Sequence, residues 1–168
     1  MRLRRPRPRE EDRPPLARDE RILAFAESDA GLLVATNLGL WLPPGRLGWH
    51  EIHKAVWDGG TLTVTAARQV EVRPWYVVVE DLPPVPFTLA APGGLPGTVR
   101  SRVTGSVGSS TYHPLPGSGG VRIAARRVPG RDGLHWTVRY DPGVDYDDPV
   151  VAKVTGELVE AARWQIGS

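Results

Sequence analysis

Residues 121–140 read Val121-Arg-Ile-Ala-Ala-Arg-Arg-Val-Pro-Gly-Arg-Asp-Gly-Leu-His-Trp-Thr-Val-Arg-Tyr140 and hold the clearest strand pair of the chain. Apolar and polar residues alternate on both sides of a Gly-Arg-Asp-Gly turn, which is typical of an antiparallel hairpin with one buried face. The register that aligns the two apolar faces places Ile123 opposite Tyr140 and Arg122 opposite Asp141. This hairpin predicts a β-sheet with a polar, Arg-bearing outer face.

A C-terminal helix follows the hairpin. Asp147 or Asp148 is predicted as its N-cap, Pro149 as its first residue and Gly167 as its stop signal. Apolar residues recur at helical spacing, which predicts an amphipathic helix packed on the sheet. The stripe consists of Val151, Val154, Leu158, Ala162 and Gln165, with Val150 and Ala161 beside it.

Short strands are predicted before the hairpin. They cover 21–27, 32–36, 40–42, 49–57 and 61–65, with one or two more within 70–80. Asp58-Gly59 favours a tight hairpin turn, after which Leu62 and Val64 point inward. Residues 82–98 are rich in Pro and Gly and predict a long connection, but the spacing of Val99 and Val103 favours a short helix near 95–106.

The stretch Gly31-Leu-Leu-Val-Ala-Thr-Asn-Leu-Gly-Leu-Trp41, followed by Gly48-Trp-His-Glu-Ile-His-Lys-Ala-Val-Trp57 and Leu62-Thr-Val64, resembles the opening of bacterial PH-like and GRAM-like domains. The resemblance implies a mainly β (α+β) fold. Its form is a partly open barrel of about seven antiparallel strands, closed by the C-terminal α-helix. We therefore expect one PH-like domain over residues 19–168.

Members of that family bind phosphoinositides, peptides or other proteins. Lipid-binding members place Lys and Arg in the first loop, whereas this chain has the acidic loop Glu27-Ser-Asp-Ala-Gly31, which disfavours a phosphate head group there. The family helix usually carries a Trp packed on the barrel, and Trp164 is the candidate for that position.

Composition excludes several classes of protein. The chain has no Cys among its 168 residues, which excludes disulfides, thiolate metal sites and Cys nucleophiles and fits a cytoplasmic protein. No apolar run approaches the roughly 20 residues of a membrane-spanning helix, and the basic start lacks the apolar stretch of a secretory signal. The basic residues are 19 Arg and 2 Lys, which indicates a GC-rich genome.

Charge is arranged in blocks. Residues 1–18 carry +4, residues 19–81 carry −4, residues 82–131 carry +6 and residues 132–168 carry −4. The first block is rich in Arg and Pro and is predicted to be a disordered tail. Its arginines either attach electrostatically to nucleic acid or an anionic membrane, or only solvate the tail. They include Arg2, Arg4, Arg5, Arg7 and Arg9.

A candidate interaction surface combines residues between 100 and 139 with two tryptophans from earlier in the chain. The outer face of the hairpin carries three arginines and a histidine, two arginines come from the acid-free block, and two tryptophans near Pro, Gly or charged residues could be exposed anchors. These residues are Arg122, Arg126, His135, Arg139, Arg100, Arg102, Trp49 and Trp75. The alternative is a solvated sheet face and a tryptophan-rich core.

No arrangement of residues predicts catalysis, a cofactor or a metal site. His50 and His53 point to opposite faces of an extended strand, so they could not share a metal ion. The leading hypothesis is a non-catalytic protein-interaction adaptor with a PH-like fold, without cofactor. The first alternative is electrostatic binding of nucleic acid or an anionic membrane, and the second is a small-ligand carrier or uncommon enzyme.

Overall fold

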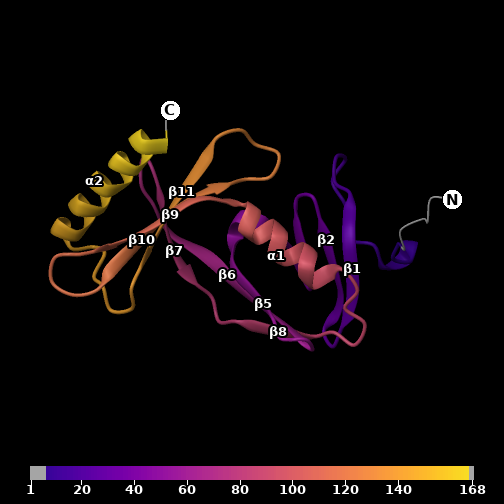
Figure 1. Cartoon of the computed structure of the whole chain (residues 1–168). Helices are drawn as coiled ribbons and strands as arrows, with labels where there is room; N and C mark the ends of the chain where they lie inside the picture. The colour runs from indigo at the N-terminus through magenta and orange to yellow at the C-terminus, as the bar shows by residue number, and fades with distance from the viewer. Residues whose placement is uncertain (1–6, 167–168) are drawn as a thin grey trace. The chain divides into compact units, whose positions relative to one another are not determined.

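The computed structural model describes residues 7–166, which form a mainly β fold with two α-helices (Figure 1). The described residues divide into two compact units. Unit 1 comprises the residues up to Ala66 and Pro83–Gly105, and unit 2 comprises Ala67–Leu82 and the residues from Ser106 onward. The chain therefore passes between the units within strand β6 (Thr61–Val72). Our prediction of one domain over residues 19–168 stays a prediction.

Unit 1 holds two antiparallel sheets and one helix. The first sheet has the order β1-β2-β3-β4, and in the second β5 and β8 pair with the first half of β6. The strands are β1 Ile22–Ser28, β2 Gly31–Thr36, β3 Gly39–Leu42, β4 Gly45–Gly48, β5 Ile52–Trp57 and β8 Val85–Thr88. Short 3-10 helices form at Glu10–Asp12 and Trp49–Glu51. The predicted short helix is confirmed as α1, Leu95–Gly105.

The core of unit 1 lies where α1 meets both sheets. Leu95, Val99 and Val103 of α1 are buried, as the spacing of the two valines requires, and they join a cluster that includes Leu33 and Leu62. Each aliphatic side chain buried in such a cluster contributes about 1.5–3 kcal/mol to stability.

A buried carboxylate ties the start of the chain to this unit. The Glu20 side chain is fully buried. One of its oxygens accepts hydrogen bonds from Thr36 Oγ1 and from Trp41 Nε1 at 3.0 Å. The other accepts from Arg46 Nη1 at 2.7 Å and from the Ala17 amide at 2.9 Å. Burial alone would raise the pKa of Glu20, but these hydrogen bonds outweigh it and hold the pKa below its ordinary value.

Acid is expected to weaken the protein through Glu20. Because its folded-state pKa lies below the unfolded value of about 4.3, the Glu20 contribution is present above that value and is lost as the pH falls through the folded pKa. At neutral pH the wild type should have a higher free energy of unfolding in urea than Glu20→Gln. This difference should shrink as the pH falls. A Glu20→Gln difference that stays constant down to about pH 3 would contradict this expectation, and the exposed Glu27→Gln is the matched control.

Unit 2 is one curved sheet covered by a helix. The sheet has the order β6-β7-β11-β10-β9, to which β6 contributes residues 67–72. The remaining elements are β7 Val77–Asp81, β9 Val107–Pro114, β10 Gly120–Arg127, β11 Leu134–Tyr140 and α2 Pro149–Ile166. Helix α2 packs on the face that carries Ile123, Trp136 and Val138.

The predicted C-terminal helix is confirmed. Asp148 is the N-cap, since its Oδ1 accepts a hydrogen bond from the Val150 amide at 2.8 Å. Val154 and Leu158 of the predicted stripe pack on the sheet. Thr155 is buried between them and accepts a hydrogen bond from the Tyr140 hydroxyl at 2.7 Å. The predicted stop, Gly167, lies outside the described residues.

The strand count and the pairing differ from the prediction. The described residues form eleven strands rather than about seven, and β7 pairs with β11 in parallel, not antiparallel. The parallel pair arises because the chain leaves β7 for residues 83–105 of unit 1 before it returns to build β9, β10 and β11. Strand β9 was missed because most of its residues are exposed and show no apolar alternation.

The predicted hairpin exists, but its register was wrong by two residues. Ile123 lies opposite Val138, and Arg122 lies opposite Arg139 rather than Asp141. The loop is longer than the predicted turn and has positive φ at Gly130 and Gly133. A slip of two residues leaves every side chain on its predicted face, so the alternation could not reveal it.

Candidate functional site

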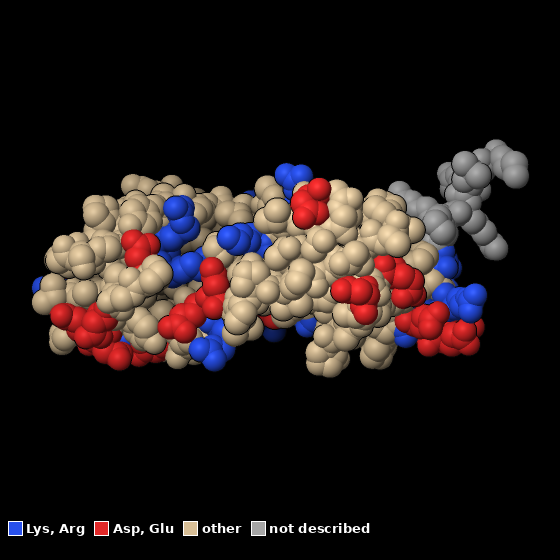
Figure 2. Space-filling model, turned by 90° about the horizontal axis from the view of Figure 1, so that it is seen from below, with Lys and Arg blue, Asp and Glu red and all other residues tan. Residues whose placement is uncertain are grey.

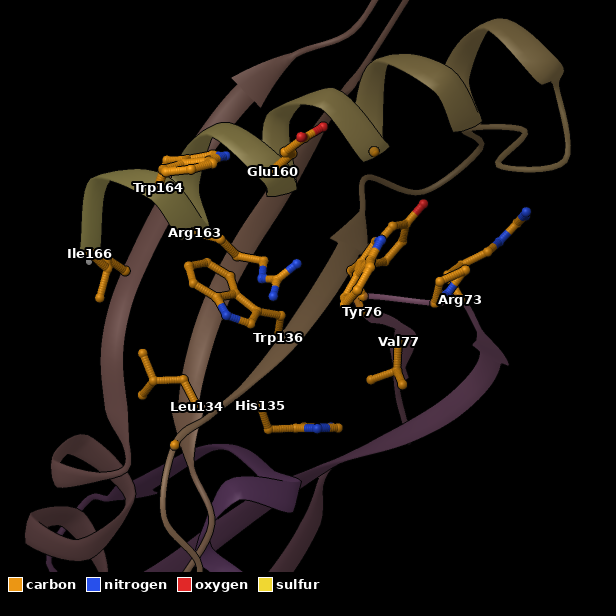
Figure 3. A pocket seen from close by; sticks show the side chains of 14 residues that line it. Arg73, Tyr76, Val77, Leu134, His135, Trp136, Glu160, Arg163, Trp164 and Ile166 are labelled. Atoms are coloured by element: carbon orange, nitrogen blue, oxygen red, sulfur yellow. The ribbon is translucent and has the colours of Figure 1, made fainter. Parts of the chain in front are cut away.

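A groove opens in unit 2 between the last turns of α2 and the starts of β7 and β11 (Figure 3). Its volume is about 890 Å³. Three segments line it, one before and within β7, one at the start of β11 and one on α2. The lining residues are Arg73, Pro74, Trp75, Tyr76, Val77, Gly133, Leu134, His135, Trp136, Gly156, Glu160, Arg163, Trp164 and Ile166. We call this feature the aromatic groove.

Two buried aromatic residues form the floor of the aromatic groove. Trp136 follows the alternation of β11 and faces α2, and Tyr76 immediately precedes β7. Both belong to the core cluster under α2. Burial raises the pKa of the Tyr76 hydroxyl, so this hydroxyl stays protonated at neutral pH. The floor is therefore a largely apolar surface that belongs to the core of unit 2.

Two exposed tryptophans form the rim. Trp75 is 66% exposed in the turn between β6 and β7, and Trp164 is 77% exposed on the last turn of α2. The turn is held by a hydrogen bond from the Arg73 amide to the Tyr76 carbonyl at 2.9 Å. The Arg163 guanidinium lies 4.5 Å from the centre of the Trp75 ring, in a cation–π contact that positions both side chains.

The basic residues of the groove differ in whether a carboxylate neutralises their charge. Arg73 forms an ion pair with Glu71 at 3.0 Å. No carboxylate within the described part of the chain forms an ion pair with Arg163. Burial, assisted by the charge of Arg131, lowers the pKa of His135, so the imidazole is neutral at neutral pH. Arg163 is thus the cation of the groove that is available to a ligand.

Of the residues predicted for an interaction surface, Trp75 and His135 line the aromatic groove. Trp49 was a candidate for an exposed anchor, with a place in the core as the alternative; the candidate position is wrong, because Trp49 is 2% exposed and belongs to the core of unit 1. Its indole N–H donates to the Thr36 carbonyl at 2.9 Å. Trp164 was expected to pack on the sheet, but it lies at the solvent-exposed rim.

The hairpin arginines lie on the sheet face away from α2, but they do not form a free cationic surface. Arg126 is only 6% exposed and donates to Ser106 Oγ at 2.6 Å. Burial and the neighbouring Arg139 lower the pKa of Arg126 to about 10. Arg139 donates to Asp81 Oδ1 at 2.9 Å. Arg122 is exposed and stacks over the Tyr112 ring at 5.6 Å.

The remaining predicted arginines are distributed elsewhere. Arg100 and Arg102 lie on α1 and belong to unit 1, whereas the hairpin arginines belong to unit 2. Arg2, Arg4 and Arg5 lie outside the described residues. Arg7 and Arg9 are exposed, and Arg9 lies 3.9 Å from a carboxylate oxygen of Glu11. On the face that Figure 2 shows, basic and acidic side chains are interspersed.

Sequence reasoning missed Tyr76, Arg163 and the groove itself. One signal for the groove was present in the sequence. Trp164 lies outside the apolar stripe of the helix, a position that favours exposure over the packing that the family resemblance implied. Arg163 and Tyr76 carried no such signal.

Within residues 7–166, no three His, Cys, Asp or Glu side chains gather as a metal site would require, and no helix is long and apolar enough to cross a lipid bilayer. Comparisons with protein-family models, with curated proteins and with solved structures gave no significant match.

Proposed function

We propose that this chain is a non-catalytic protein-interaction module, a cytoplasmic adaptor with a PH-like fold, and that the aromatic groove is its binding surface. The order of short strands followed by a packed C-terminal helix supports the PH-like interpretation. The groove supports the binding role, since it gathers exposed aromatic side chains above a floor that belongs to the core of unit 2.

The observation that carries the proposal is the exposure of Trp75 and Trp164 on one groove. Large aromatic side chains rarely stand in solvent together, and exposed apolar patches mark interaction sites. Trp, Tyr and Arg are the residues that most often dominate binding energy at protein interfaces. The aromatic groove holds all three types next to one another (Figure 3).

A protein segment fits this arrangement better than a small molecule does. The volume of about 890 Å³ falls within the range of ligand pockets. The two rim tryptophans, however, project into solvent, and a small ligand on the floor would leave most of their surface exposed. A partner that lies across the groove would bury both rings along with the floor, which is how interface anchors contribute affinity.

Removal of either rim tryptophan is expected to abolish most of the binding. Peptides selected from a random display library on the full chain should bind Trp75→Ala and Trp164→Ala about thirtyfold or more weakly, because a tryptophan that the partner buries contributes about 2 kcal/mol or more. Isothermal titration with the selected peptides measures the change. Both variants should unfold at wild-type urea concentrations, since neither side chain is buried.

Val150→Ala is the matched control. Val150 is 57% exposed on the first turn of α2 and does not line the groove, so this variant should bind like the wild type. Peptides whose affinity is insensitive to both tryptophan variants would contradict the proposed binding surface.

A further inference from the structure

The inference rests on the proposed function and names the chemistry of the partner. We propose that the segment that binds the aromatic groove carries a carboxylate next to an apolar side chain, and that Arg163 binds this carboxylate while the aromatic rings bind the apolar group.

Arg163 is held in place before any partner arrives. Its guanidinium stacks at 4.5 Å on the Trp75 ring, and its side chain extends from α2 toward Trp136 and Tyr76 (Figure 3). A stacked guanidinium keeps its planar edge of N–H donors free for a further acceptor. Less conformational freedom is then lost when a ligand binds, which favours affinity.

The charge of Arg163 is not compensated within the described residues. Arg73, the other arginine of the groove, is occupied by Glu71 at 3.0 Å. Glu160 also lines the groove, but in Figure 3 its carboxylate points away from Trp136 and Tyr76. His135 contributes no charge at neutral pH. One half-buried cation between aromatic walls therefore faces the site where the partner would lie.

A carboxylate fits this cation better than other anions. Guanidinium and carboxylate match in geometry and can form two parallel hydrogen bonds, and their charges cancel. A phosphate dianion would keep about one uncompensated charge between apolar walls, where desolvation is costly. The apolar group beside the carboxylate follows from Trp75, Trp136 and Trp164, whose aromatic side chains line the same groove.

Display selection with a library of random peptides tests the proposal. On the wild-type chain we expect enrichment of Asp or Glu beside an aromatic or large aliphatic residue. Selection on Arg163→Glu should enrich Lys or Arg at the same position instead. A peptide selected on the wild type should bind Arg163→Gln about tenfold or more weakly, because a charge-assisted hydrogen bond is lost.

Lys153→Gln and Lys153→Glu are the matched controls. Lys153 is exposed on the same helix, its replacement changes the charge equally, and it does not line the groove. These variants should keep the acidic preference. Peptides that need Trp164 but show no acidic enrichment, or that bind Arg163→Gln at full strength, would overturn this inference and leave the proposed function intact. Peptides indifferent to Trp75→Ala and Trp164→Ala would overturn the proposed function itself.

Discussion

Replacement of Trp49 by alanine is expected to destabilise unit 1 by about 3–5 kcal/mol, the usual cost of removing a buried aromatic side chain. Trp49 is 2% exposed and packs in the cluster that joins both sheets of unit 1 to α1. The substitution opens a large cavity in that cluster. It also removes the hydrogen bond that the indole donates to the Thr36 carbonyl at 2.9 Å, leaving a buried acceptor without that donor.

Urea unfolding followed by far-UV circular dichroism measures this loss, and Trp164→Ala is its counterpart. The same chemical change at a side chain that is 77% exposed should alter stability by no more than about 0.5 kcal/mol. Equal losses at the two positions would contradict the burial of Trp49 in the core of unit 1.

Replacement of Glu20 by leucine is expected to cost about 3 kcal/mol. The carboxylate accepts hydrogen bonds from one amide and from three side chains of buried or half-buried residues, and its removal leaves these donors without their acceptor. Loss of one partner of a buried ion pair costs about 3–5 kcal/mol. We expect the lower end of this range for Glu20→Leu, because the Arg46 side chain is 33% exposed and water can solvate its charge once the carboxylate is gone.

The distinguishing measurement is again urea unfolding at neutral pH, with Glu27→Leu as control. Glu27 is an exposed residue of β1, so its replacement should change stability by about 0.5 kcal/mol or less. If Glu20→Leu proved as stable as the wild type, the carboxylate could not be the anchor of residues 17–20. The isosteric variant Glu20→Gln should have a free energy of unfolding between those of the wild type and Glu20→Leu, because its side chain keeps one acceptor oxygen.

The faces of the elements could be predicted from the sequence because local periodicity encodes them. The inward direction of Ile123 and Val138 and the buried face of α1 follow from alternation and helical spacing alone. Register could not be predicted, since a slip of two residues leaves that pattern unchanged. The sequence left both exposure and burial open for Trp49, because Trp49 begins a 3-10 turn that breaks the alternation of an extended strand.

The aromatic groove depends on contacts that are remote in sequence. Its three segments lie around residues 75, 135 and 163, and the parallel pairing of β7 with β11 brings the first two together. No local sequence pattern encodes this pairing, because β8, α1 and the hairpin of β9 and β10 lie between β7 and β11 in the chain. Trp75 and Trp136 were each noticeable in the sequence, but their meeting with Arg163 and Trp164 is a property of the fold.

The most direct test of the binding surface uses the indole N–H signals of the six tryptophans in a ¹⁵N-correlated NMR spectrum, assigned by single substitutions. Addition of a selected peptide should shift the signals of Trp75, Trp136 and Trp164, which line the groove. The signals of Trp41, Trp49 and Trp57, which belong to unit 1, should stay in place. Shifts confined to the unit 1 tryptophans, or no indole shift at saturating peptide, would contradict the assignment of the aromatic groove as the binding surface.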